Sequence, residues 1–423
     1  MKFFDVFFIT LTLTPSQRGQ IYPEAKKQSQ ALSMSLSPTI SQLKVLAILP
    51  MISGSFSIIG SSLIIYRIRI DRKNRLSKVY HRLIYAMSSL DIFQSIFAAL
   101  STIPVPKDAS PAWANYGNNT SCKLQAFGIV ATSGVMFYNC ALSLYFFLSI
   151  KFGMRDCTLK KVIEPSMHIF CLGWPICWAI TGLLLNVYNF SGNKCWIAPN
   201  PIDCIKKEQV ECIEGEFAYS FRWYCSGAPL IVTVFVIFVS QFLIYRTIRE
   251  QDKKMQKYGR NSILSRIAKE DSEAKELISK TQHKTIKLKR IGNRNTALLQ
   301  RSINRSLVQR SMKVAKRGSA YVATAFMTYI WSLIYRVHEQ HMESEPPLFL
   351  IFIAQFFFPL QGFFNYFIYT QPEIEQIHEN NPEKSRLWAL KESITLPFYH
   401  SDLIITTNQL RRQRRSASNN VID

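Results

Sequence analysis

The chain contains seven blocks of mainly apolar residues, each close to the length of about 20 residues that crosses a bilayer as a helix. A soluble protein has no use for so many long apolar runs, because a helix on its surface needs a polar face. The expected spans are Val45–Tyr66, Leu83–Ile103, Cys122–Ile150, Ser166–Tyr188, Phe217–Tyr245, Ser319–Val337 and Leu348–Tyr369. The sequence therefore predicts an all-α membrane protein, built as a seven-transmembrane helix bundle in a lipid bilayer.

Lys and Arg gather in alternate connections between these blocks, around Arg67–Arg82, around Lys151–Lys161 and in a long basic loop at about 247–316. Of the connections on the other side, the first has only Lys107 as a basic residue, and the next two are rich in acidic residues. Because basic loops stay in the cytoplasm, this pattern predicts an external N-terminus and a cytoplasmic C-terminus. Topology also accounts for the net charge of +23, so we expect no nucleic-acid partner.

These boundaries divide the chain into three regions. Residues 1–43 form an expected extracellular tail, whose apolar run Val6–Leu13 weakly resembles a signal segment. Residues 44–370 form the bundle with its long cytoplasmic loop. Residues 371–423 form an expected cytoplasmic tail.

The external loops carry the residues that an oxidising, glycosylating compartment would modify. Acceptor patterns for N-glycosylation begin at Asn118, Asn119 and Asn189. Four cysteines lie in or beside the same loops: Cys122, Cys195, Cys204 and Cys212. Disulfides persist in that compartment, and four cysteines allow three pairings that spacing alone leaves open. On the other side, Cys157 lies beside the membrane, where reversible palmitoylation is an alternative to a plain thiol.

Seven spans, an external N-terminus, a cysteine at the top of the third span and another in the next external loop resemble the G-protein-coupled receptor superfamily. This resemblance covers about residues 45–370 and implies a disulfide between Cys122 and Cys195. Cys204 and Cys212 would then form the second pair.

Particular motifs sharpen the resemblance. "PLQGFFNYFIY" in the seventh span is similar to receptors of the protist cyclic-AMP-receptor and secretin-like type, and "MSSLDIF", with Asp91, is similar to a second-span element of the superfamily. The third span ends in "YFFLSIKFGMRD" without an Asp/Glu-Arg-Tyr triplet, and the sixth span lacks Cys-Trp-x-Pro. The chain therefore departs from ordinary rhodopsin-like members.

The resemblance implies a plasma-membrane receptor that passes a signal from an unknown extracellular ligand to a heterotrimeric G protein. Receptor kinases would be further partners on the cytoplasmic face. We expect no cofactor, no metal and no enzymatic activity, because the histidines form no intramembrane cluster with carboxylates. The alternative is a multi-pass transporter or channel, although such proteins often show internal repeats that are not evident here.

The seventh span places polar residues and helix breakers in a strongly apolar setting. Pro359 frees backbone groups and allows a kink, and Gly362 permits close helix approach. Polar side chains in a span usually face protein, which predicts an intramembrane network of Asp91, Asn139, Gln361 and Asn365. The network acts either as a rearranging switch around a bendable helix or as a static staple between helices.

Two further residues or motifs have competing interpretations. Arg222, near the outer end of the fifth span, could bind an anionic ligand, but Trp223 and Tyr224 beside it favour a side chain that reaches the membrane interface. The motif "HEQH" at 338–341 could bind a metal ion, but two histidines without a third ligand are weak evidence for one.

Overall fold

The computed structural model describes residues 39–277, 312–338 and 346–399, except 110, 155, 203, 205–210 and 314, with the backbone alone at 252, 254–277 and 396–399. The expected signal segment, about half of the long loop, residues 339–341 of the HEQH motif and the end of the C-terminal tail lie outside the described residues. The described part of the chain is mostly helical. Its sheet consists of two short antiparallel strands, β1 (Tyr188–Phe190) and β2 (Cys195–Ile197).

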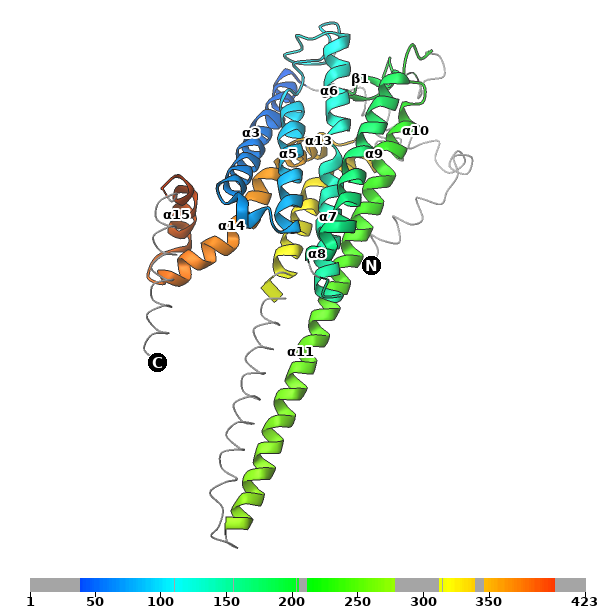
Figure 1. The fold of residues 1–423 in the computed structure, drawn as a ribbon. Coiled ribbons are helices and arrows are strands. Elements are labelled where there is room, and N and C mark those ends of the chain that lie inside the picture. The colour runs from blue at the N-terminus through cyan, green and yellow to red at the C-terminus, as the bar shows by residue number, and fades with distance from the viewer. Residues whose placement is uncertain are drawn as a thin grey trace, which may run out of the picture.

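Helices lie at all seven apolar blocks. The long ones are α3 (Ile40–Ile70), α5 (Val79–Ala99), α6 (Asn119–Ala131) followed by α7 (Gly134–Lys151), α9 (Glu164–Leu184), α10 (Ala218–Arg222) followed by α11 (Ala228–Leu277), a helix over residues 315–338, and α13 (Leu348–Phe357) followed by α14 (Gln361–Asn380). The shorter ones are α4 (Arg72–Arg75), α8 (Asp156–Thr158) and α15 (Arg386–Tyr399). They pack side by side as a bundle, with β1 at one end and α15 at the other (Figure 1).

Five helical segments of the described chain are long and apolar enough to cross a membrane: Ile40–Ile70, Asn119–Lys151, Asp156–Leu184, Ala218–Gln251 and Leu348–Asn380. The α5 helix is not among them, because it carries His81, Arg82 and Asp91 within 21 residues. Five segments of this length and composition are typical of a helical membrane protein.

Apolar side chains on the outside of the bundle agree with this conclusion. Ile169 and Leu184 of α9 are 72% and 75% exposed, and Phe235 of α11 is 67% exposed. Patches of this kind are costly in water but stable against lipid. The faces of α9 and α11 are therefore suited to contact hydrocarbon.

The interior contains two apolar clusters. One joins α3, α5, α7, α11 and α14 through buried residues that include Ile64, Met87, Leu142, Ile244 and Tyr366. The other joins the strands to α6, α9 and α10 and includes Ala126, Ala179, Trp196 and Phe221. The bundle is thus packed separately at its two ends, and the polar features described below lie among these helices.

The structure differs from two expected boundaries. The first span begins at Ile40, because Thr39 and Gln42 form a reciprocal capping box. The fifth helix continues to Leu277, well into the loop expected to begin at about 247. Residues 246–277 contain no proline, one glycine and many good helix formers, so the helix has no reason to end at the membrane.

Candidate functional site

A buried polar centre joins α3, α5 and α14. Asp91 of α5 is 2% exposed, and its Oδ2 accepts hydrogen bonds from the hydroxyls of Ser57 (3.1 Å) and Ser61 (2.6 Å) of α3. The backbone N–H of Gly362 in α14 donates to the Ser57 Oγ at 2.8 Å. These bonds supply polar partners to a carboxyl group that would otherwise be costly inside a membrane.

Glycines let α3 and α14 approach closely at this centre. A β-carbon at Gly362 would lie 2.0 Å from the Asp91 Oδ2 and 2.2 Å from the Ser61 Oγ. A β-carbon at Gly60 would lie 2.6 Å from the carbonyl oxygen of Gly362. Only glycine leaves enough room at both positions, so backbone meets backbone where the two helices cross.

The structure does not join the other predicted network members to Asp91. Asn139 donates through Nδ2 to the carbonyl of Val135, one turn earlier, at 3.0 Å. Gln361 accepts a hydrogen bond from the Tyr329 hydroxyl at 2.7 Å. Asn365 is 1% exposed, and neither polar atom of its side chain has a hydrogen-bond partner among the described residues. The sequence missed Ser57 and Ser61, because serine in an apolar helix usually bonds its own backbone.

The seventh helix is interrupted at Pro359. The α13 helix ends at Phe357, a 3₁₀ turn, η4, covers Phe358–Leu360, and α14 starts at Gln361. Proline cannot donate the bond that a continuous α-helix needs there, and a short 3₁₀ segment within a helix often marks a hinge. Pro359 thus interrupts the helix three residues before the close approach at Gly362.

A cavity of about 130 Å³ lies between the helices on the side of the strands. Its walls come from α5, α6, α7, β2 with Lys194 just before it, α10, residues 223–227, α11, residues 329–336, α13 and Phe358. Six aromatic side chains line it: Trp196, Tyr219, Trp223, Tyr329, Tyr335 and Phe358. Phe358 opens the 3₁₀ turn, and Tyr329 bonds Gln361, so the cavity touches the interruption of the seventh helix at two points.

Three cationic side chains also line the cavity: Lys194, Arg222 and Arg336. Arg222 is 7% exposed, and its Nε donates to the carbonyl of Ile197 at 3.1 Å. The interfacial position favoured by its aromatic neighbours is therefore wrong, because the side chain turns inward. The guanidinium carbon of Arg336 lies 4.0 Å from the ring centre of Trp196, a cation–π arrangement.

Lys194 comes from the loop just before β2 and is 9% exposed. Its Nζ lies 4.8 Å from the ring centre of Phe358. Burial, together with the charge of Arg336, lowers the pKa of Lys194 from its usual 10.5 to about 7. Sequence reasoning missed Lys194 and Arg336, because nothing in a sequence places a loop lysine beside an arginine more than 140 positions later.

Replacing Lys194 with methionine is expected to stabilise the protein in anion-free buffer. Below pH 7 the folded protein bears the full cost of a buried charge, and above pH 7 Lys194 loses its proton in the folded state before it does in the unfolded state. The penalty is therefore largest at pH 6 and falls as the pH rises towards 10.5. Lys194→Met should raise the denaturation midpoint more at pH 6 than at pH 9, as measured by a thermal-shift assay.

Lys123→Met is the matched control for this substitution. Lys123 lies on α6, contacts Glu214 at 3.4 Å and does not line the cavity. Its replacement should leave the midpoint unchanged or slightly lowered at both pH values, since such half-exposed ion pairs contribute little. A midpoint for Lys194→Met that falls at pH 6 would contradict the burial of a costly charge.

The loop that carries Lys194 is held by a disulfide. The sulfur atoms of Cys122 and Cys195 lie 1.99 Å apart, joining the start of α6 to β2, and those of Cys204 and Cys212 lie 1.95 Å apart. These are the two pairs implied by the sequence resemblance. The first pair fixes β2, and with it Lys194 and Trp196, against the bundle.

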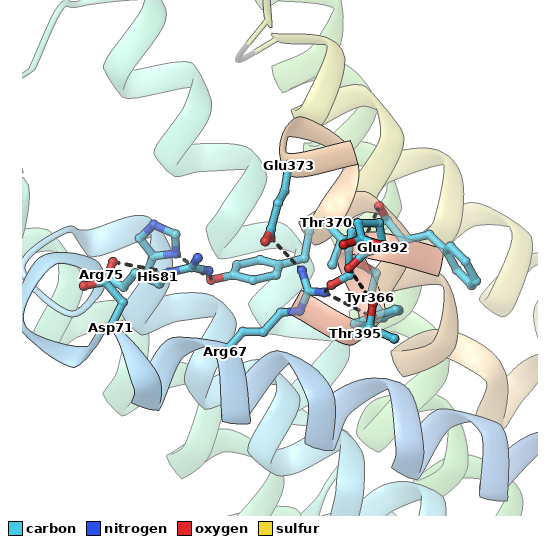
Figure 2. A network of polar contacts seen from close by, with 12 residues as sticks. Arg67, Asp71, Arg75, His81, Tyr366, Thr370, Glu373, Glu392 and Thr395 are labelled. Atoms are coloured by element: carbon cyan, nitrogen blue, oxygen red, sulfur yellow. Dashed lines mark hydrogen bonds and ion pairs between the residues drawn. The ribbon is translucent and has the colours of Figure 1, made fainter. Parts of the chain in front are cut away.

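A second polar network lies at the end of the bundle away from β1 (Figures 1 and 2). Arg67 of α3 is 4% exposed, and its Nη1 lies 2.7 Å from the Glu373 Oε2 in α14. Its Nη2 donates to the hydroxyl of Tyr366 and to the backbone carbonyl of Ser393 in α15. One arginine thus ties the C-terminal helix to the base of the first and seventh helices.

The remaining predicted residues lie as follows. Asn118 caps α6, its side chain accepting a bond from the N–H of Ser121, and Asn119 is exposed. Asn189 lies in β1 and donates to the carbonyl of Ala198 at 3.0 Å. Cys157 is exposed. Within the described residues no group of three potential metal ligands comes together, and of the HEQH motif only His338 is described.

Comparison of the chain with protein-family models and with curated proteins finds no match. The features of the chain that bear on its function are therefore the cavity, the polar centre and the interrupted seventh helix.

Proposed function

We propose that this protein is a seven-helix receptor of the plasma membrane that passes an extracellular signal to a heterotrimeric G protein. In this proposal α5 and the helix over 315–338 span the bilayer along with the five more apolar segments. The strands and the cavity face the outside, and α15 lies in the cytoplasm. Glycans at Asn118, Asn119 and Asn189 are expected on the outer face.

The observation that carries the proposal is the contact between the cavity and the seventh helix. Tyr329 lines the cavity and bonds Gln361, the residue before Gly362. Gly362 in turn bonds Ser57, which bonds Asp91. A ligand that moves Tyr329 or Phe358 therefore acts on a helix that is already interrupted at Pro359, and a shift between two helix positions is how receptors transmit binding energy.

The opposite end of the bundle supports the same proposal. The seventh helix continues as α14 to the contacts of Arg67 with Glu373 and Tyr366 (Figure 2). The same arginine donates to the backbone carbonyl of Ser393 and so also holds α15. A displacement of α14 would change these contacts and the surface that α15 covers. The G protein and the regulatory kinases are proposed to bind this face, next to the long extension of α11.

Guanine-nucleotide exchange provides the test. The full-length protein in nanodiscs is mixed with a panel of purified heterotrimers, and exchange is compared with that of empty discs. We expect basal exchange above that of empty discs on at least one heterotrimer. Tyr329→Phe removes the hydroxyl that bonds Gln361 and keeps the ring, so it should change that exchange by about fivefold, the equivalent of one hydrogen bond.

Tyr224→Phe is the matched control, because the Tyr224 side chain is 66% exposed and does not line the cavity. Its exchange rate should equal that of the unaltered protein. If no heterotrimer responds to folded, disulfide-bonded protein, the receptor proposal fails. If Tyr329→Phe and Tyr224→Phe behave alike, the link from the cavity to the seventh helix is wrong.

Transport is the second candidate, and the interruption of the seventh helix favours it. Broken helices beside a buried cavity bind substrate in many transporters. Uptake of a labelled solute into proteoliposomes, without exchange activity on any heterotrimer, would replace the receptor proposal with this one.

A further inference from the structure

Among the described residues that line the cavity, Lys194 alone carries a primary amine. We propose that the cavity binds a small aromatic aldehyde and that the Nζ of Lys194 forms a reversible imine, a Schiff base, with its carbonyl carbon. The inference names the ligand class of the proposed receptor site. It rests on the receptor function only for the signal that the adduct would produce.

The backbone that carries Lys194 is held in place. The N–H and the hydroxyl of Ser191 both donate to the carbonyl oxygen of Lys194 at 2.9 Å. The next residue, Cys195, is bridged to Cys122 at the start of α6. The amine therefore enters the cavity from a fixed point, and a nucleophile that is positioned in advance reacts faster than a mobile one.

The surroundings of this amine favour its uncharged form. Lys194 is 9% exposed, its Nζ lies 4.8 Å from the ring centre of Phe358, and no carboxylate of the described residues pairs with it. Burial is the larger cause of its pKa of about 7, and burial acts on Lys194 whatever Arg336 contacts.

An uncharged amine is the form that attacks a carbonyl group, and desolvation is one way in which proteins activate a lysine for this reaction. At pH 7 about half of the Lys194 side chains are uncharged. For an ordinary exposed lysine the uncharged fraction is below about one in a thousand. Lys194 is thus prepared for a reaction that exposed lysines undergo slowly at neutral pH.

Imine formation needs no oxidant or reductant. The lone pair of Nζ attacks the carbonyl carbon, and one proton passes from nitrogen to the carbonyl oxygen, which gives a carbinolamine. The carbinolamine then loses its hydroxyl group and the second nitrogen proton as water, leaving a C=N bond to Lys194. Because an imine is less basic than an amine, the product suits a buried site better than an ammonium group does.

Size and aromatic lining define the rest of the ligand. A volume of about 130 Å³ is near the roughly 150 Å³ of a protein cavity that holds benzene. Six aromatic residues provide faces and edges against which a ring packs. One ring with a formyl group fits this space.

The adduct would form beside the interruption of the seventh helix. The Lys194 ammonium lies over the ring of Phe358, the first residue of the 3₁₀ turn. An imine has no ammonium charge to hold over that ring, and it brings a second ring next to Phe358. Binding would thus change the contact between Lys194 and the turn that precedes α14.

Reductive trapping tests the proposal without any G protein. The full-length protein, in phosphatidylcholine nanodiscs whose lipid has no primary amine, is treated with benzaldehyde and sodium cyanoborohydride. The reagent reduces the imine to a stable secondary amine, and peptide mass spectrometry gives the rate of benzylation at each lysine. At pH 7 we expect Lys194 to be benzylated at least about tenfold faster than Lys107, an exposed lysine.

The pH dependence distinguishes Lys194 from exposed lysines. Between pH 7 and pH 9 the uncharged fraction of Lys194 about doubles, whereas that of an ordinary exposed lysine rises about 100-fold. The ratio of the benzylation rate at Lys194 to that at Lys107 should therefore fall as the pH rises. The other charged or titratable groups of the described lining carry no primary amine and form no adduct that survives reduction: Arg222, Arg336, Cys225, Tyr219, Tyr329 and Tyr335.

Thermal denaturation without the reductant measures reversible binding. Benzaldehyde should raise the denaturation midpoint at concentrations at least about tenfold lower than benzyl alcohol, which has the same ring and no carbonyl group. Lys194→Met is expected to be more stable than the unaltered protein and yet to lose this rise, a combination that misfolding cannot produce. Lys123→Met removes a lysine that does not line the cavity and should keep the rise.

Three results would overturn the proposal: benzylation of Lys194 no faster than that of Lys107, an equal rise of the midpoint with benzyl alcohol, or an unchanged rise in Lys194→Met. Butanal tests the aromatic part, because equal selectivity for Lys194 over Lys107 with butanal and benzaldehyde would show that the ring is not recognised. Trapping at Lys194 without nucleotide exchange would count against the receptor proposal alone. Exchange without trapping would count against this inference alone.

Discussion

Replacing Gly362 with alanine is expected to remove most of the folded protein from the membrane. The added methyl group would lie 2.0 Å from the Asp91 Oδ2 and 2.7 Å from the carbonyl oxygen of Ser57, so α14 would have to move away from α3. Overpacking typically costs about 1–3 kcal/mol, and a contact with backbone at this distance is expected at or above the upper end. The measurement is the fraction of monodisperse protein in size-exclusion chromatography, together with its denaturation midpoint.

Gly173→Ala is the control for this substitution. Gly173 lies within α9, and a β-carbon there would meet nothing within 4 Å. The same chemical change should therefore be neutral, or stabilise the helix by up to about 1 kcal/mol. Equal behaviour of Gly362→Ala and Gly173→Ala would show that α3 and α14 do not meet at the glycines.

Loss of the disulfide between Cys122 and Cys195 is expected to have the second large effect. The two residues are 73 positions apart, and the chain entropy of a loop that long corresponds to about 4 kcal/mol. Removing both cysteines by alanine substitution should lower the denaturation midpoint.

The bridge between Cys204 and Cys212 provides an internal comparison. Its residues are only 8 positions apart, for which the same estimate gives about 2.5 kcal/mol. The double alanine variant of this pair should therefore lower the denaturation midpoint by less than loss of the first bridge. A greater loss of stability from this pair would contradict the role given to the bridge that holds the loop carrying Lys194.

Hydropathy alone predicted where the helices lie, because apolar blocks of membrane length have few alternatives. Hydropathy did not predict where the helices end. The α3 helix starts earlier than its apolar block because Thr39 and Gln42 form a capping box, a pattern that is visible in the sequence. The α11 helix ends later than its apolar block because the residues after Arg246 have high helix propensity. The disulfide pairs followed from the resemblance, since spacing left three possibilities open.

The candidate site was less accessible to sequence reasoning. Asp91 and Gly362 stand out because they interrupt apolar blocks. Their partners, however, depend on the rotation of each helix about its own axis, and that rotation is set by packing among all the helices. Asn139 and Asn365 carry the same polar signal as Asp91, yet neither is hydrogen-bonded to it. The cationic lining of the cavity depends on a loop, the start of the fifth helix and the end of the sixth, which no local pattern brings together.

Because α11 is 50 residues long, a small tilt of this helix at the membrane produces a large displacement at its far end. At about 1.5 Å per residue, the part that follows Arg246 extends about 45 Å beyond the end of the expected span, far from the other described helices (Figure 1). A tilt of about 5° at the membrane would carry its far end through about 4 Å, several times the displacement of the helix inside the bundle. A protein bound at the far end of α11 would therefore undergo a larger displacement than the helices of the bundle. By the same geometry, a small force applied there would be enough to resist or reverse a rearrangement around the cavity.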